Sequence, residues 1–225
     1  MKNVQQAIGL LGYKNISHMV LTLSVFDVLK RSNRSTFDRR AFWIHSTASA
    51  IMSVKIAKAC LYRSEDDVFT AGLLHDIGKV FMDGFLHEFF DKIIDHAQEN
   101  GQSFHATERA LFDVDHSMIG EWVARSWTFP LLVTAVIKHH HQEQQERRGL
   151  VFSSDVAVDF VRLADVMVRR EGYGTNGDGK EFVTTISPEL FQRLPISETD
   201  VYALLENLKN DVENSEILLD LATKG

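Results

Sequence analysis

Apolar residues recur at three- and four-residue spacing along most of this 225-residue chain, and this period constrains the fold more than any other feature. Such a repeat lines one face of an α-helix, whereas a half-buried strand would alternate apolar and polar residues. The chain contains only three prolines, so long helices meet few breakers. The sequence therefore predicts an all-α fold, with helices over residues 4–11, 16–29, 37–61, 65–74, 87–100, 103–111, 116–126, 130–141, 153–170, 187–193 and 197–209.

Four glycines within residues 171–180 mark the clearest break in the chain. We expect a glycine-rich loop over residues 171–181, which separates a helical core over residues 37–170 from a C-terminal helical extension over residues 182–225. Residues 1–36 are expected to form helices that lead into the core.

Composition excludes several classes of partner. The net charge is −7 and no long basic run is present, which argues against nucleic acid as the primary ligand. No apolar stretch approaches the roughly 20 residues of a membrane helix, and the N-terminus lacks an export signal. Cys60 is the only cysteine, which excludes an internal disulfide and a cysteine-cluster metal site. We therefore expect a cytoplasmic protein without a membrane partner, and a phosphorylated ligand would need a metal ion to supply positive charge.

The string GLLHDIGK at residues 72–79 carries the strongest chemical signal. Adjacent His75 and Asp76 offer a neutral nitrogen and an anionic oxygen that can bridge two cations, a set suited to Fe, Mn, Zn or Mg. A single His-Asp pair is more often a polar contact at a helix end, so this interpretation depends on further ligands elsewhere in the chain.

Further candidate ligands occur on other predicted helices. They are His45, His116, the run His139-His140-His141 and Asp165. His45 and Asp165 lie on apolar stripes, and burying either without a partner is costly, so a cation or dense hydrogen bonding is expected there. The alternative is that these residues are caps and hydrogen-bonded core residues that never meet.

Taken together, these motifs resemble the HD superfamily of metal-dependent phosphohydrolases, and most closely its HDOD subfamily of bacterial signalling output domains. The order of the histidines and aspartates is similar to that superfamily's ligand series. Residues 6–12 (QAIGLLG) resemble the helix that joins the two lobes of HDOD proteins, and residues 71–79 match the subfamily's central signature. His116, Gly120, Trp127 and Pro130 fall in its spacing. The resemblance spans roughly residues 4–170, and its motifs are specific in combination.

The resemblance implies an HD-like helical bundle with one or two divalent metal ions. His45, His75, Asp76 and Asp165 would hold one ion, and Asp76 would bridge to a second held by His116, His140 and His141. The ungapped spacing selects His140 and His141 rather than His139, which we expect to be exposed. Asp76 and Lys79 would be the catalytic residues, with Lys79 stabilising developing negative charge on a phosphate. The alternative for Lys79 is a cation near a helix C-terminus.

Three departures from the related families limit what the resemblance implies. A full-length HDOD pattern has another helical lobe before residues 6–12, so residues 1–36 would be the remnant of a first lobe in a natural half or a truncated chain. The Gly-Tyr-Pro sequence of HD-GYP cyclic-dinucleotide phosphodiesterases is replaced by residues 142–148, QEQQERR. The acidic residue that those enzymes place one turn before the first ligand is Ala41 here, so a third metal would lose a ligand.

Two functions of different class follow. The first is a metal-dependent phosphohydrolase acting on a phosphorylated small molecule or nucleotide. The second is a regulatory module with a structural metal, which relays a signal by contacting a signalling protein. A site closed by protein ligands would favour the second. Elsewhere, the sequence predicts buried tryptophans at Trp43, Trp122 and Trp127, and solvated pairs at Arg147-Arg148 and Arg169-Arg170.

Overall fold

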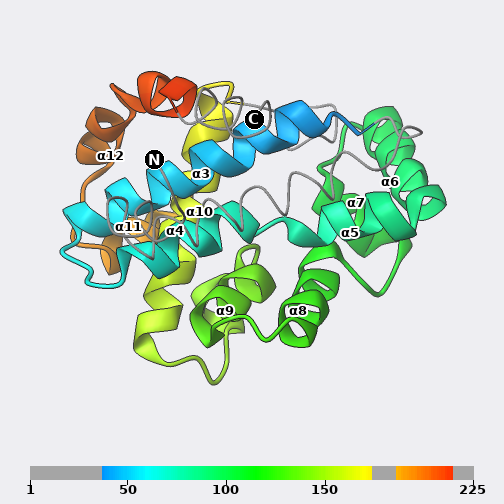
Figure 1. Ribbon diagram of the computed structural model, residues 1–225, viewed down its shortest axis with the longest axis horizontal. Coiled ribbons are helices and arrows are strands. Elements are labelled where there is room, and N and C mark those ends of the chain that lie inside the picture. Colours follow the sequence, from blue (N-terminus) through cyan, green and yellow to red (C-terminus); the bar gives the residue numbers. More distant parts are fainter. Residues whose placement is uncertain (1–36, 174–185, 215–225) are drawn as a thin grey trace, which may run out of the picture.

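The computed structural model describes residues 37–173 and 186–214, and within these ranges the chain is helical and contains no strand (Figure 1). The all-α prediction is confirmed. The elements, in chain order, are α3 (Arg39–Ala59), α4 (Glu65–Leu74), α5 (Ile77–Phe85), α6 (His87–Asn100), α7 (Phe104–Leu111), α8 (His116–Ser126), α9 (Leu131–His139), the 3-10 turn η1 (Gln144–Glu146), α10 (Phe152–Arg170), α11 (Pro188–Arg193) and α12 (Glu198–Leu205). The helices predicted over residues 4–11 and 16–29, and most of the predicted loop at 171–181, lie outside the described residues.

Helix boundaries follow the local signals in the sequence. Asp38, Ser103 and Asp115 each accept a hydrogen bond from a backbone N–H of the helix that follows, at α3, α7 and α8 respectively. Gly101 ends α6 in the left-handed conformation with φ 63°. Pro130 precedes α9, where its missing N–H removes no helical hydrogen bond.

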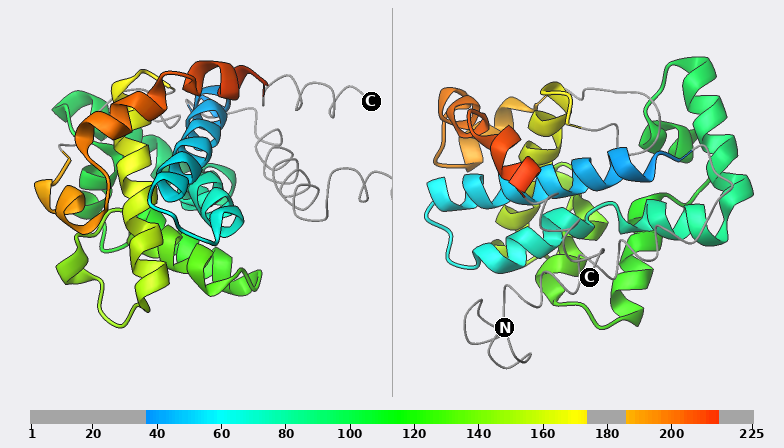
Figure 2. Two further views of the ribbon diagram at one scale, coloured as in Figure 1. Left: turned by 90° about the vertical axis from the view of Figure 1, so that its left-hand side faces the viewer. Right: turned by 45° about the horizontal axis from the view of Figure 1, so that its top comes forward.

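The interior is organised around α3 and α10, which pack against each other and against α4 (Figures 1 and 2). Helix α9 contacts α4, α8 and α10, so it closes the bundle on the side away from α3. Large side chains with under 2% exposure, among them Phe42, Phe160, Ile137 and Leu163, fill the space between these helices. This core fixes α3, α4, α9 and α10, the helices that carry or adjoin most of the polar residues singled out above.

Helix α5 was not predicted, because Gly78 and Lys79 directly after His75-Asp76 looked like the end of a helical pattern. The structure places Gly78 inside the first turn of α5, where its lack of a side chain permits backbone contact with α8. A Cβ at Gly78 would lie 1.8 Å from the carbonyl oxygen of His116. The glycine therefore brings two helices together instead of ending one, and it leaves His75 and Asp76 in a tight turn between α4 and α5.

The C-terminal helices pack onto the same core. Val201 and Leu208 are fully buried, and α12 contacts α3. Lys55 on α3 donates to the carbonyl oxygen of Leu204 at 3.2 Å and pairs with Asp211 at 2.6 Å. Within the described residues, no helix combines the length and apolar character needed to cross a bilayer.

Arg147 is buried, which corrects the prediction of a solvated Arg147-Arg148 pair. Its guanidinium lies 3.1 Å from Asp155 Oδ1 and 2.7 Å from Asp159 Oδ1, both on α10. Arg193 of α11 contacts the same two carboxylates at 2.6 and 2.8 Å. The network ties the segment after the histidine run to α10 and to the C-terminal helices.

Two of the three tryptophans predicted to be buried lie at the surface. Trp43 is buried, but Trp122 is 60% and Trp127 54% exposed. The inward face of α8 is formed by Gly120, Val123 and Ala124. Trp122 therefore faces outward, where its ring lies edge-on to that of Phe81 at 5.6 Å.

Candidate metal centre

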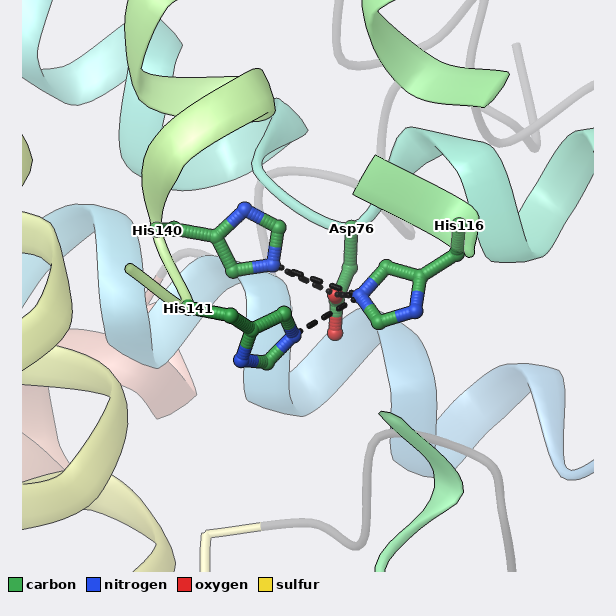
Figure 3. A group of neighbouring side chains, drawn as sticks. All are labelled: Asp76, His116, His140 and His141. Atoms are coloured by element: carbon green, nitrogen blue, oxygen red, sulfur yellow. Dashed lines mark hydrogen bonds and ion pairs between the residues drawn. The ribbon is translucent and has the colours of Figure 1, made fainter. Parts of the chain in front are cut away.

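All seven side chains predicted as metal ligands lie together around the turn between α4 and α5, in two adjacent groups. Within each group, one donor atom of every residue lies within 4.8 Å of the others. The Asp76 group, shown in Figure 3, consists of Asp76, His116, His140 and His141. The Asp165 group consists of His45, His75 and Asp165. The groups adjoin where His75 Nε2 and Asp76 Oδ2 are 3.5 Å apart. The structure thus brings the predicted residues together, and their role as ligands stays a prediction.

In the Asp76 group, three imidazole nitrogens and one carboxylate oxygen face a common point (Figure 3). Asp76 Oδ1 lies 3.0 Å from Nε2 of His116 and 3.4 Å from Nε2 of His140. The Nε2 atom of His116 lies 3.3 Å from that of His140 and 2.9 Å from that of His141. Donors bonded to one ion at about 2.1 Å are separated by roughly 3.0 Å at right angles and 3.4 Å in a tetrahedron. The group therefore already has the spacing of a ligand shell.

The ring orientations in both groups are fixed by acceptors on the far side of the imidazoles. Nδ1 of His75 lies 2.7 Å from the carbonyl oxygen of Gly72, and Nδ1 of His140 lies 2.8 Å from that of Ile137. A carbonyl oxygen only accepts, so each Nδ1 donates and the neutral ring presents its Nε2 lone pair inward. Metal-binding histidines are generally held by such a second hydrogen bond.

His116 is held in the same way by Glu108, a residue that sequence analysis did not single out. Glu108 is fully buried, and its carboxylate accepts from His116 Nδ1 at 2.6 Å and from the His116 backbone N–H at 2.8 Å. It lies on α7, eight residues before His116, and no periodic pattern links the two positions. We identify Glu108 as a positioning residue for His116.

The two oxygens of Asp76 have different partners. Oδ2 accepts from Lys79 Nζ at 3.0 Å, whereas Oδ1 is buried and faces the histidines, 3.0 Å from Nε2 of His116. Burial alone would raise the pKa of Asp76, but Lys79 and His75 outweigh it and hold the pKa well below its ordinary value. Lys79 is almost fully buried in the first turn of α5, so its interpretation as a cation near a helix C-terminus is wrong.

Charge is divided unequally among the histidines of the two groups. Burial lowers the pKa of His75 to about 4, and it also lowers the pKa values of His140 and His141. Burial acts on His116 in the same direction, but Glu108 and Asp76 outweigh it and raise the pKa of His116 to about 9. A positive charge on the His116 ring is therefore favourable, and this ring lies beside the point where a metal ion would bind.

In the Asp165 group a single carboxylate oxygen makes most of the contacts. Asp165 Oδ1 lies 2.9 Å from His45 Nε2 and 3.8 Å from His75 Nε2. The same oxygen accepts from Nε of Arg169 at 2.9 Å. Burial opposes ionisation of Asp165, but Arg169 and His45 outweigh it, so its pKa is lowered. Arg169 was predicted to be solvated, and its burial beside Asp165 corrects that prediction.

Two other histidines lie near the Asp76 group but outside it. His105 stacks on His141 with ring centroids 4.0 Å apart and pairs with Asp115 at 3.4 Å. His139 was expected to be exposed, but it is 8% exposed and its Nδ1 lies 2.5 Å from Gln142 Oε1. It belongs to neither group, in agreement with the register in which His140 and His141 are the ligand pair.

The profile of the HDOD domain family matches residues 1–143, which is more than half of the chain. The chain belongs to the HDOD family. The matched range includes every residue of the Asp76 group, and Asp165 and Arg169 lie beyond it. A curated relative, an uncharacterized protein from Treponema pallidum, is 23% identical over 137 residues. That match covers 60% of this HDOD chain and about a quarter (26%) of the relative's own length.

Solved structures share the HDOD fold with this chain. An HDOD domain protein of unknown function from Geobacter sulfurreducens superposes with a TM-score of 0.77 at 22% identity, covering 95% of this chain and 74% of that one. A protein from Shewanella amazonensis, named as a candidate phosphohydrolase, gives 0.66 at 19% identity, over 93% and 73%. The MmoQ response regulator from Methylococcus capsulatus gives 0.58 at 22% identity, over 91% and 76%. At these identities the likeness establishes the fold.

Proposed function

We propose that this HDOD signalling domain binds a divalent metal ion through Asp76, His116, His140 and His141, and that the loaded centre hydrolyses a phosphoester. One observation carries the proposal. Three Nε2 atoms and a buried carboxylate oxygen face one point at ligand spacing. In the metal-free chain a proton on His116 relieves only part of the repulsion between these lone pairs, and a divalent cation would satisfy all four donors at once.

The donor chemistry narrows the choice of ion. Three imidazoles and one carboxylate suit Fe, Mn or Zn better than Mg, which prefers oxygen ligands and retains water. When bound, such an ion polarises a phosphoryl oxygen and lowers the pKa of water. Within the chain, Lys79 neutralises Oδ2 of Asp76 and so orients Oδ1 toward the ion. His141 is the least buried member of the group, so a substrate would approach on its side, past the partly exposed His105.

A second function, a structural ion in a non-catalytic signalling module, is favoured by the burial of the donors. Asp76 and His116 are fully buried and His140 is 4% exposed. Four protein donors would complete a tetrahedral shell and leave no open position, the arrangement of structural zinc sites. In that case the ion would stabilise the surface that a signalling partner contacts. The likeness to a response regulator agrees with both functions.

Metal content and turnover separate these proposals. Purified protein is loaded separately with Mn, Fe and Zn, dialysed, and assayed by mass spectrometry for metal per chain. We expect Asp76→Ala to lose the ion and His139→Ala, the neighbouring histidine outside the group, to retain it. Equal metal content in both variants would contradict the assigned ligands, provided that circular dichroism shows both to be folded.

The loaded protein is then assayed on p-nitrophenyl phosphate, bis(p-nitrophenyl) phosphate, nucleotides and cyclic di-GMP. We expect metal-dependent hydrolysis of a phosphoester without preference for cyclic di-GMP, because residues 142–148 replace the Gly-Tyr-Pro sequence. Preferential cleavage of cyclic di-GMP would overturn the substrate proposal. A fully loaded protein that cleaves no member of the panel would establish the structural ion instead.

A further inference from the structure

Arg169 gives the two groups of candidate ligands different chemistry. It lies one helical turn after Asp165 on α10, and both side chains are only 10% exposed. Its Nε donates to Asp165 Oδ1, the same oxygen that lies nearest to His45 and His75. The carboxylate oxygen nearest to both histidines is therefore already engaged by a permanent positive charge.

The Asp76 group lacks this conflict, because Asp76 divides its two oxygens between two tasks. Lys79 bonds to Oδ2, and Oδ1 faces the imidazoles of the three histidines, which can lose a proton to a metal ion whereas a guanidinium cannot. Donor spacing agrees with this difference. In the Asp76 group, His116 Nε2 lies 3.3 and 2.9 Å from the Nε2 atoms of His140 and His141, whereas in the Asp165 group Oδ1 lies 2.9 Å from His45 Nε2 but 3.8 Å from His75 Nε2.

We infer that the guanidinium of Arg169 is the resident cation of the Asp165 group, so that the chain binds one divalent ion, in the Asp76 group. This inference rests on one part of the proposed function, namely that the Asp76 group binds a metal ion, and it does not depend on hydrolysis of a phosphoester. A guanidinium stays protonated throughout the pH range of folded proteins, so the arginine charge cannot be removed by deprotonation. A second ion would have to displace Arg169 from Asp165 or lie within a few ångströms of it.

A count of formal charges supports the same conclusion. Three carboxylates, those of Asp76, Asp165 and Glu108, oppose two fixed cations, Lys79 and Arg169, when all are counted as ionised. One divalent ion changes the net charge from −1 to +1, whereas two ions would leave +3 among buried donors. Repulsion between like charges grows as the local dielectric constant falls, so the second ion is strongly disfavoured.

The test compares the wild type with Arg169→Gln and with Arg170→Gln, the adjacent arginine, which pairs with Tyr202 and contacts no candidate ligand in the hydrogen bonds described. Mn(II) is the probe, titrated by calorimetry and followed by electron paramagnetic resonance. We expect wild type and Arg170→Gln to bind one ion, with any second ion at least about 100-fold weaker. Arg169→Gln should bind a second ion within about tenfold of the first and show the spectrum of a spin-coupled Mn pair.

Ligand variants locate the single ion. His141→Ala should lose it, and His45→Ala should retain it, because His45 belongs to the Asp165 group alone. Two ions of similar affinity in the wild type would overturn this inference while leaving the proposed function intact, and so would loss of the ion in His45→Ala. A wild type that binds no ion would overturn both. Arg169→Lys, which keeps the charge, should remain a one-ion protein if Arg169→Gln proves unfolded.

Discussion

Glu108→Gln tests the metal centre without altering any proposed ligand. The side chain keeps its size, but the carboxylate that accepts from both Nδ1 and the backbone N–H of His116 becomes an amide with a single acceptor oxygen. Either the backbone N–H or the imidazole then loses its partner, or the ring changes tautomer and directs its proton at the ion.

The size of the effect follows from the bonds lost. A metal ion withdraws electrons from the imidazole, so the bond from Nδ1–H to a carboxylate strengthens when the ion binds. Hydrogen bonds to charged groups contribute about 1.5–3 kcal/mol, and each 1.4 kcal/mol corresponds to about tenfold in affinity. We therefore expect the Kd for metal to rise by about 10- to 100-fold, the range found for such partners of metal-binding histidines.

The assay is competition with a fluorescent chelator at fixed pH, with circular dichroism to establish that the variant is folded. Glu99→Gln on α6 is the matched control, because Glu99 is exposed and distant in sequence from every candidate ligand. An unchanged Kd in Glu108→Gln, or an equal change in Glu99→Gln, would refute the argument that Glu108 positions His116.

Three further predictions concern stability. Gly78→Ala should lower the free energy of unfolding in urea by about 3 kcal/mol or more, because the added Cβ would lie 1.8 Å from the His116 carbonyl oxygen. In the control Gly84→Ala the added Cβ meets no atom within 4 Å, so that variant should be neutral or stabilising. Equal effects of the two substitutions would contradict the contact between Gly78 and α8. Arg147→Leu should cost up to about 3–5 kcal/mol, because it removes the buried guanidinium between Asp155 and Asp159 and leaves only Arg193 beside them. The exposed Arg148→Leu should cost less than about 0.5 kcal/mol, and urea unfolding of both variants checks this. Metal at about 100 times its Kd should stabilise the wild type by about 2.7 kcal/mol and raise Tm by roughly 5–10 °C, and a melting scan of Asp76→Ala should show no such rise.

Much of the site could be anticipated because polar residues on apolar helical stripes are conspicuous. His45 and Asp165 stood out in this way, and the structure brings both to His75. Glu108 could not be found by the same means. Its contact with His116 depends on how α7 returns to α8 through a connection with no periodic signal.

Other differences arose where one local signal had two physical meanings. Glycine after a helix commonly marks its end, but Gly78 serves close packing, so α5 was not predicted. Adjacent arginines at a helix end usually face water. Arg169, however, lies four residues after Asp165 and so shares its helical face, a spacing that could have predicted the ion pair. Trp122 was assigned to the core by residue type, although the small residues of α8 define its inward face.

The distribution of the Asp76 group along the chain sets an order of events during synthesis. Asp76 leaves the ribosome 40 residues before His116 and 65 before His141, so a nascent chain offers the complete donor set only after His141 has been added. Because the donors converge only after α5, α8 and α9 have packed, capture of an ion would follow the assembly of these helices and then resist their separation. A bound ion would act as a late cross-link that closes two long loops of the chain, and removing it would free α5, α8 and α9 to separate.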